Sequence, residues 1–264
     1  MKYFFCLFML CTLRLMGNTG GDTLVPLGKV SYRFETKCEK HLLQNGRVSL
    51  YFNSFYSMCL YEDVPEKSDI IENGMNFQTI EGDPDKMLQF VDFSRKQIAY
   101  KQFARFLPRN IVKEELPSIK WQIQTETKVI AGRKCQKATC SLGGRNYVAW
   151  FCSELPYAIG PYKFTGLPGV IFEIASTDGF VKYTFTGIEI KKNPLIIMHP
   201  PIHGKTFASK NKLIEADKAH YENAKKQMAA FIAQKGIKGA SIYREAPINY
   251  FIEKEYEWGG SETE

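Results

Sequence analysis

Apolar and polar residues alternate along much of this chain, and this period of two is typical of β-strands with one buried face. Phe and Tyr, with 19 and 14 copies, supply most of the aromatic residues and favour strands. The short connections between the alternating runs indicate that successive strands pair antiparallel. The predicted strands cover residues 30–36, 48–61, 87–93, 97–103, 120–130, 134–141, 145–152, 170–174 and 180–190.

Turn-forming residues separate these runs. Asn45-Gly46 predicts a turn between the first two strands, and Asp178-Gly179 predicts a hairpin before the last one. Residues 62–86, which are polar and broken by Pro and Gly, predict a surface loop, and residues 107–117 predict a connector.

One segment has the helical period instead. Ser209 suits the N-cap of a helix and Gly236 suits its C′ position, and apolar residues recur at helical spacing between them. We therefore expect a helix over residues 209–235 with one stripe packed on the sheet. The predicted fold class is α+β and mainly β: a large twisted antiparallel sheet, a meander or half-barrel, with this long helix of the C-terminal half packed on it. Residues 249–258 could add an edge strand.

The N-terminus has the form of a secretory signal peptide. Lys2 precedes an apolar run of about 11 residues, which is too short to span a membrane. No small residues precede Cys11 as they would in a lipoprotein signal. We therefore expect removal of residues 1–20, a single β-rich domain over residues 21–258, and a disordered tail at residues 259–264. The expected product is a soluble periplasmic or secreted protein.

Charge and motif content exclude several classes of function. The net charge of +7 is spread in mixed-sign runs, whereas a nucleic-acid site needs clustered basic residues. The chain has no Cys-x-x-Cys and no His at metal-binding spacing from a Cys, so we expect no metal. Nucleophile and phosphate-loop motifs are also lacking, so we expect no cofactor and assign no catalytic residue. A thiol enzyme using Cys140 or Cys38 with a distant His stays an alternative.

A Gly143-Gly144 turn would set the register of one hairpin. It would place Cys135 opposite Cys152 at a non-hydrogen-bonded position, with Cα atoms about 4.5 Å apart. That separation suits a disulfide, which we predict; the alternative is two small buried residues side by side. The same register gives a core face with Ala138, Cys140, Tyr147, Ala149 and Phe151, and a second face with Lys137, Thr139, Val148, Trp150 and Cys152. The apolar residues of the second face predict that this face is shielded from solvent, either by the helix or by a ligand.

Residues 160–174 concentrate turn formers just before a buried strand. Leu167-Pro168-Gly169 suits a type II turn, in which Gly supplies a positive φ, and residues 170–174 predict a strand. The two aromatic residues before this turn are expected to be exposed and are the first to test for partner contact. The candidate binding residues are Trp150, Gly160, Pro161, Tyr162, Phe164, Gly166, Leu167, Pro168 and Gly169.

This segment, with Val170 where the family name has its second Leu, resembles the signature of the GLPGLI family. Residues 131–138, 144–150 and 183–187 also resemble that family, so the similarity covers about residues 120–190. The resemblance implies an exported protein of Bacteroidetes-type bacteria without an established biochemical activity, and it transfers no catalytic residue. Cys152 departs from the family pattern, in which a Thr-like residue is more usual.

The sequence therefore favours a noncatalytic exported protein with a binding or accessory role. Its expected partner is an envelope protein, or an apolar ligand or lipid held in the hollow of a curved sheet. The alternative is a secreted hydrolase-type enzyme with an unrecognised site. A polar cleft that gathers His, Glu or Cys would favour the enzyme.

Overall fold

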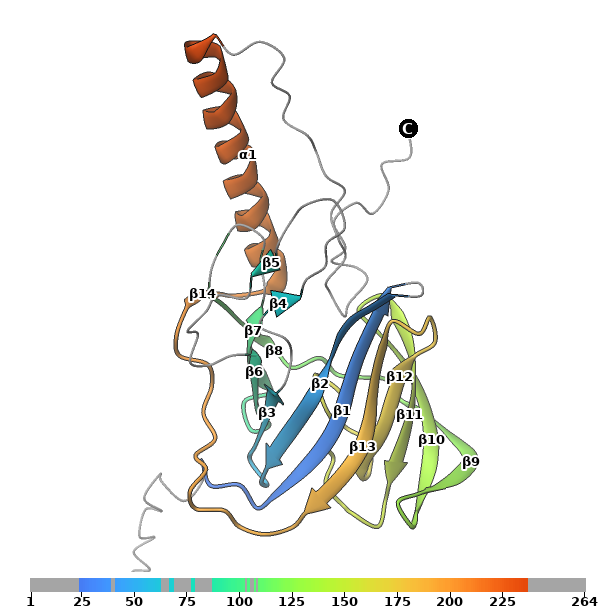
Figure 1. Ribbon diagram of the computed structural model, residues 1–264. Coiled ribbons are helices and arrows are strands. Elements are labelled where there is room, and N and C mark those ends of the chain that lie inside the picture. The colour runs from blue at the N-terminus through green and yellow to red at the C-terminus, as the bar shows by residue number, and fades with distance from the viewer. Residues whose placement is uncertain are drawn as a thin grey trace, which may run out of the picture.

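The computed structural model of this 264-residue chain describes residues 24–38, 41–62, 67–68, 77–78, 87–102, 104, 107 and 109–236. The expected signal peptide, the C-terminal tail and the edge strand at residues 249–258 lie outside these residues. Figure 1 shows a strongly curved sheet with one helix projecting from it.

Twelve strands form the main sheet, in the order β14-β8-β7-β6-β3-β2-β1-β13-β12-β11-β10-β9. All neighbouring strands are antiparallel except β14 and β8, which are parallel. The predicted class, a large and mainly antiparallel sheet that is not closed, is confirmed. The strands are β1 (Gly28–Cys38), β2 (His41–Phe52), β3 (Tyr56–Glu62), β6 (Met87–Asp92), β7 (Gln97–Gln102), β8 (Asn110–Glu115), β9 (Gln122–Ile130), β10 (Arg133–Leu142), β11 (Arg145–Cys152), β12 (Val170–Ser176), β13 (Val181–Glu189) and β14 (Lys205–Phe207). Two short strands, β4 (Lys67–Ser68) and β5 (Phe77–Gln78), pair separately.

The sheet curves around one face, which we call the inner face and which carries Tyr32, Tyr61, Tyr147 and Tyr183. The hydroxyl oxygens of Tyr61 on β3 and Tyr183 on β13 are 2.9 Å apart, although β2 and β1 lie between their strands. Neighbouring strands are about 4.8 Å apart, so a flat sheet would hold these side chains well apart. The largest buried cluster fills this inner face.

Two turns differ from the sequence prediction. Asn45-Gly46 is not a turn, because both residues pair with β1 inside the ladder, Gly46 opposite Phe34. Residues 48–61 are not one strand either. The chain reverses between β2 and β3, where the Asn53 side-chain oxygen accepts hydrogen bonds from the backbone N–H groups of Phe55 and Tyr56 at 2.8 and 2.9 Å.

Four strands were not predicted from the sequence: β4 and β5, which lie in the predicted surface loop, and β8 and β14. β8 lies in the segment predicted to be a connector, and β14 lies in a Pro-rich stretch without a strand pattern. Lys205, Thr206 and Phe207 of β14 pair in parallel with β8. Parallel pairing joins segments that are far apart in the chain, so no local sequence pattern predicts it.

Helix α1 (Lys210–Lys235) begins and ends as predicted. The Ser209 side chain accepts a hydrogen bond from the backbone N–H of Lys212, and Gly236 has a left-handed φ of 63°. The expected packing of one stripe on the sheet is confined to the first turns of the helix. Only Lys210, Leu213 and Asp217 of this helix are buried, and the rest projects away from the sheet.

Candidate functional site

The connection between β11 and β12, residues 153–169, covers the inner face of the sheet. Phe164 and Leu167 are 0% and 1% exposed, and Tyr162 is 7% exposed. The Phe164 ring meets Tyr147 edge-on, with ring centroids 4.7 Å apart. The prediction that Tyr162 and Phe164 are exposed is therefore wrong: both are part of the core because the loop folds inward.

Backbone hydrogen bonds hold this loop against the start of β12. The Val170 N–H donates to the Leu155 carbonyl at 3.1 Å, and the Ile171 N–H donates to the Ile159 carbonyl at 2.9 Å. The predicted type II turn is absent. Gly169 lies outside the left-handed region and its N–H donates to the Leu167 carbonyl at 2.8 Å, a three-residue turn around Pro168.

Two glycines of the motif are required by close backbone contacts. A Cβ on Gly169 would lie 2.2 Å from the Cys152 carbonyl oxygen, and one on Gly160 would lie 2.6 Å from the Phe164 carbonyl oxygen. Gly166 is required for a different reason, since its φ of 93° lies in the region that favours glycine. A Cβ there would have space, because the nearest atom is in the Trp121 indole at 3.9 Å. The indole Nε1–H of Trp121 donates to the Thr165 carbonyl at 2.8 Å.

A buried ion pair ties the same loop to the far side of the sheet. The Lys163 ammonium lies 2.7 Å from Glu114 Oε1, and the two side chains are 4% and 16% exposed. Glu114 also accepts from the Tyr100 hydroxyl at 3.0 Å and from the backbone N–H of Lys210 at 3.2 Å. Glu114 on β8 thus joins the motif loop, β7 and the first turn of α1.

Neither residue of this ion pair was predicted from the sequence to be functional. Lys163 was visible as the one charged residue of residues 160–172, which is a signal that a partner must be buried with it. Glu114 gave no signal, because its segment was predicted to be a connector. In the same half of the sheet, the amide of Gln89 on β6 and the side-chain oxygen of Asn110 on β8 are buried and have no hydrogen-bond partner in the structure.

Proton-bearing groups of the inner face are neutral at physiological pH. Burial raises the pKa of the Cys59 thiol to about 12 and raises the pKa of Tyr32, Tyr61 and Tyr183 well above the ordinary phenol value. The Tyr32 hydroxyl donates to the Ile171 carbonyl at 2.7 Å, at the end of the motif. Within this packed core the hydroxyls of Tyr61 and Tyr183 bond to each other.

The protein should lose stability at alkaline pH. The unfolded chain releases thiol and phenol protons near their ordinary values of 9.0 and 10.0, while the folded chain keeps them. The stabilisation is complete below about pH 9 and is lost as the pH rises toward 12, so we expect the melting temperature to fall over this range. In a Cys59→Ala variant, the melting temperature should fall less steeply with rising pH. A melting temperature that is constant or rises above pH 9 would contradict the assignment.

The predicted Cys135–Cys152 disulfide is absent. The register was right, since Gln136 pairs with Phe151 and Leu142 with Arg145. However, Cys59, Cys135, Cys140 and Cys152 are free buried thiols, and the Cys135 thiol donates to the Arg133 carbonyl at 3.7 Å. Burial raises the pKa of Cys135 and Cys140 to about 12. This does not suit Cys140 as a nucleophile, and the Cys38 side chain lies outside the described residues.

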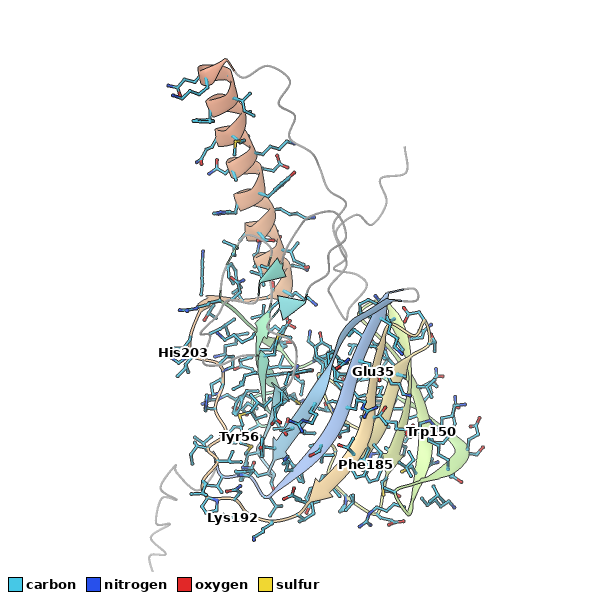
Figure 2. The ribbon with its side chains drawn as sticks, in the orientation of Figure 1. Glu35, Tyr56, Trp150, Phe185, Lys192 and His203 are labelled. Atoms are coloured by element: carbon cyan, nitrogen blue, oxygen red, sulfur yellow. The ribbon has the colours of Figure 1, made fainter. Side chains whose placement is uncertain are left out.

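Trp150 lies on the second face of the hairpin, as predicted, and is half-buried (Figure 2). The helix does not cover it, because α1 contacts β8 and β14 instead. The Lys128 ammonium of β9 lies 4.5 Å from the centre of the indole and also bonds to the Glu173 carboxylate. Trp150 is therefore separated from the motif loop by the sheet itself.

The described residues contain no group of three or more His, Cys, Asp or Glu placed to hold a metal ion. No helix in the described part of the chain combines the length and apolar character needed to cross a bilayer.

Comparison with known proteins matches one part of the chain. Residues 143–173, which include β11, the motif loop and the start of β12, match the model of the GLPGLI family, described as "Protein of unknown function (Porph_ging)". The family resemblance found in the sequence is thereby confirmed. A search of curated proteins gave no match.

Among solved structures, two crystal forms of PNGF-II are similar at a distance. The P21 form has a TM-score of 0.46 and 13% sequence identity, and it covers 70% of this chain and 32% of PNGF-II. The C2 form has a TM-score of 0.46 and 14% sequence identity, and the similar region covers 73% of this chain and 32% of PNGF-II. The present chain thus spans about a third of PNGF-II.

Proposed function

The chain carries the GLPGLI family segment, and from this premise we propose that it is a noncatalytic exported protein that binds another protein of the cell envelope. The sheet serves as a rigid support, and the contact element is the outer half of α1. The observation that carries this proposal is the exposure of the large apolar residues Met228 and Phe231, at 53% and 49%, on a helix with no buried residue after Asp217.

The exposed apolar residues continue the face by which α1 is attached. Leu213, Ala224, Met228 and Phe231 are spaced at 11, 4 and 3 residues and therefore lie on one side of the helix. Leu213 packs against the sheet in the second cluster of buried residues, whereas none of the described strands lies beneath the later members of this stripe. A partner groove could accept the stripe as an amphipathic helix.

Charge defines the chemistry of that partner. Lys225, Lys226 and Lys235 lie in the outer half of α1, and residues 223–236 contain no Asp or Glu. The expected partner is an envelope protein with an apolar groove edged by acidic side chains. Binding of an apolar ligand or lipid in the sheet is less well supported, because residues 153–169 occupy the inner face where the ligand would lie.

The alternative of a hydrolase-type enzyme needs a polar cleft with an activated nucleophile. The described thiols with a resolved shift, Cys59, Cys135 and Cys140, each have a pKa raised to about 12, which opposes nucleophilic activation. The buried carboxylate of Glu114 is occupied by three donors from the chain itself. These observations favour the binding role.

In-cell photo-crosslinking tests the helix. A photoreactive amino acid at position 231 should give one discrete adduct with an envelope protein, and the crosslinked peptide should contain apolar and acidic residues. The Lys225→Glu/Lys226→Glu variant should reduce its yield about tenfold. The same amino acid at position 129 is the control, because Val129 is 72% exposed on β9, away from α1. An adduct with lipid or with a second copy, or no adduct specific to position 231, would overturn the proposal.

A further inference from the structure

A second exposed apolar surface lies at the opposite end of the molecule from the outer half of α1. The chain between β13 and β14, residues 190–204, runs along the side of the sheet, and Figure 2 marks Lys192 near its start and His203 near its end. Met198 anchors this segment, since its side chain is 0% exposed and packs with Met58, Leu88 and Phe90. The segment is therefore a fixed part of the surface.

The start of this segment is a rigid turn. The backbone N–H groups of Leu195 and Ile196 donate to the Asn193 side-chain oxygen at 3.1 Å and to the Asn193 carbonyl at 3.2 Å. Two further bonds tie the turn to the first described residues, from Asn193 N–H to the Pro26 carbonyl at 3.4 Å and from Met198 N–H to the Leu24 carbonyl at 2.8 Å. Pro194 adds a fixed φ.

This turn presents large apolar side chains to solvent. Leu195 at its apex is 92% exposed, and Ile190 and Ile197 are 47% and 49% exposed. Leu27, next to the anchored residues 24–26, is 37% exposed. Single exposed apolar residues are ordinary, but a group of them around one rigid turn is typical of an interaction site.

The same surface is basic. Lys191 and Lys192 are exposed beside the apolar residues. Residues 190–214 contain no Asp or Glu, and Glu189 is the acidic residue that borders them. Side chains that project from a convex turn do not need a matching groove if the partner is fluid, and lysines beside them attract negative charge.

We propose that the turn at residues 190–197, with Leu27, docks on an anionic phospholipid bilayer. Leu195 and Ile197 enter the boundary between head groups and acyl chains, and Lys191 and Lys192 lie among the phosphates. The protein then lies on the membrane by this surface while α1 points away from it (Figure 1). The inference is independent of the protein partner of α1.

Vesicle sedimentation tests the proposal with the chain as purified from the exporting cell. Vesicles of phosphatidylglycerol mixed with phosphatidylcholine should sediment the protein, and vesicles of phosphatidylcholine alone should do so roughly tenfold less. The Leu195→Asp/Ile197→Asp variant should lose roughly tenfold in partitioning to the mixed vesicles. Lys191→Gln/Lys192→Gln should abolish most of the dependence on anionic lipid and on salt.

The controls separate this surface from α1. Met228→Asp/Phe231→Asp should keep full binding to vesicles, and Val129→Asp, at another highly exposed apolar position, should keep it too. Melting temperatures should match in all variants because every changed residue is exposed. Failure of the mixed vesicles to sediment the protein would overturn the proposal, as would equal binding to both vesicle types or unchanged binding by the Leu195→Asp/Ile197→Asp variant.

Discussion

Gly169→Ala is expected to lower the free energy of unfolding by about 3 kcal/mol or more. A Cβ at this position would lie 2.2 Å from the carbonyl oxygen of Cys152, 2.6 Å from its carbonyl carbon and 2.9 Å from Ser153 Cα. All three atoms are backbone, and Cys152 pairs with Val170 in the β11–β12 ladder. A shift that relieved the contact would therefore separate the motif loop from the strand that it enters.

The matched control is Gly187→Ala on β13. A Cβ on Gly187 meets nothing within 4 Å, and its φ is outside the left-handed region. We expect the free energy of unfolding of this variant, measured by chemical denaturation, to lie within about 0.5 kcal/mol of that of the unchanged protein, as is usual for surface substitutions. Equal stability of the Gly169→Ala and Gly187→Ala variants would show that the loop does not pass close to Cys152 as the structure has it.

The second large effect is expected for Glu114→Gln, at about 3 kcal/mol of lost stability. This change removes the carboxylate that balances the ammonium of Lys163, whose side chain is only 4% exposed. The change keeps the side-chain volume, so the loss would be electrostatic. The measurement is again the free energy of unfolding in denaturant, with melting temperature as a second readout.

A double variant distinguishes the ion pair from a general effect of substitution. Glu114→Gln combined with Lys163→Met removes both charges and should recover most of the loss, because no uncompensated charge is then buried. Glu126→Gln is the surface control: its ion pair with Lys137 is exposed, so no measurable change is expected. A Glu114→Gln variant as stable as the unchanged protein, or a double variant less stable than Glu114→Gln, would contradict this account.

Elements specified by local pattern were predicted well. Ser209 and Gly236 bound α1 as expected because a helix cap is decided by the residues next to it. The Gly143-Gly144 turn set the β10–β11 register, and the faces of that hairpin followed from it. Each of these predictions depends on residues close in the chain.

Predictions failed where a local signal competed with a distant one. Asn45-Gly46 is a strong turn pair, yet pairing with β1 keeps it extended. Tyr162 and Phe164 lie among turn formers and were expected at the surface, but the curvature of the sheet creates an inner face that they fill. The disulfide prediction had the right register, but the cysteines are free thiols.

The sequence by itself determined the strand-rich class, the capped helix, the hairpin register and the family segment, because periodicity, caps and turn residues act over a few positions. Only the tertiary structure decided what the motif is for. It showed that residues 153–169 cover the inner face and that Gly160 and Gly169 are needed for close contact with backbone. It also showed that Lys163 meets Glu114 across 49 positions of the chain. Such contacts depend on how far the whole sheet curves, which no short stretch of residues specifies.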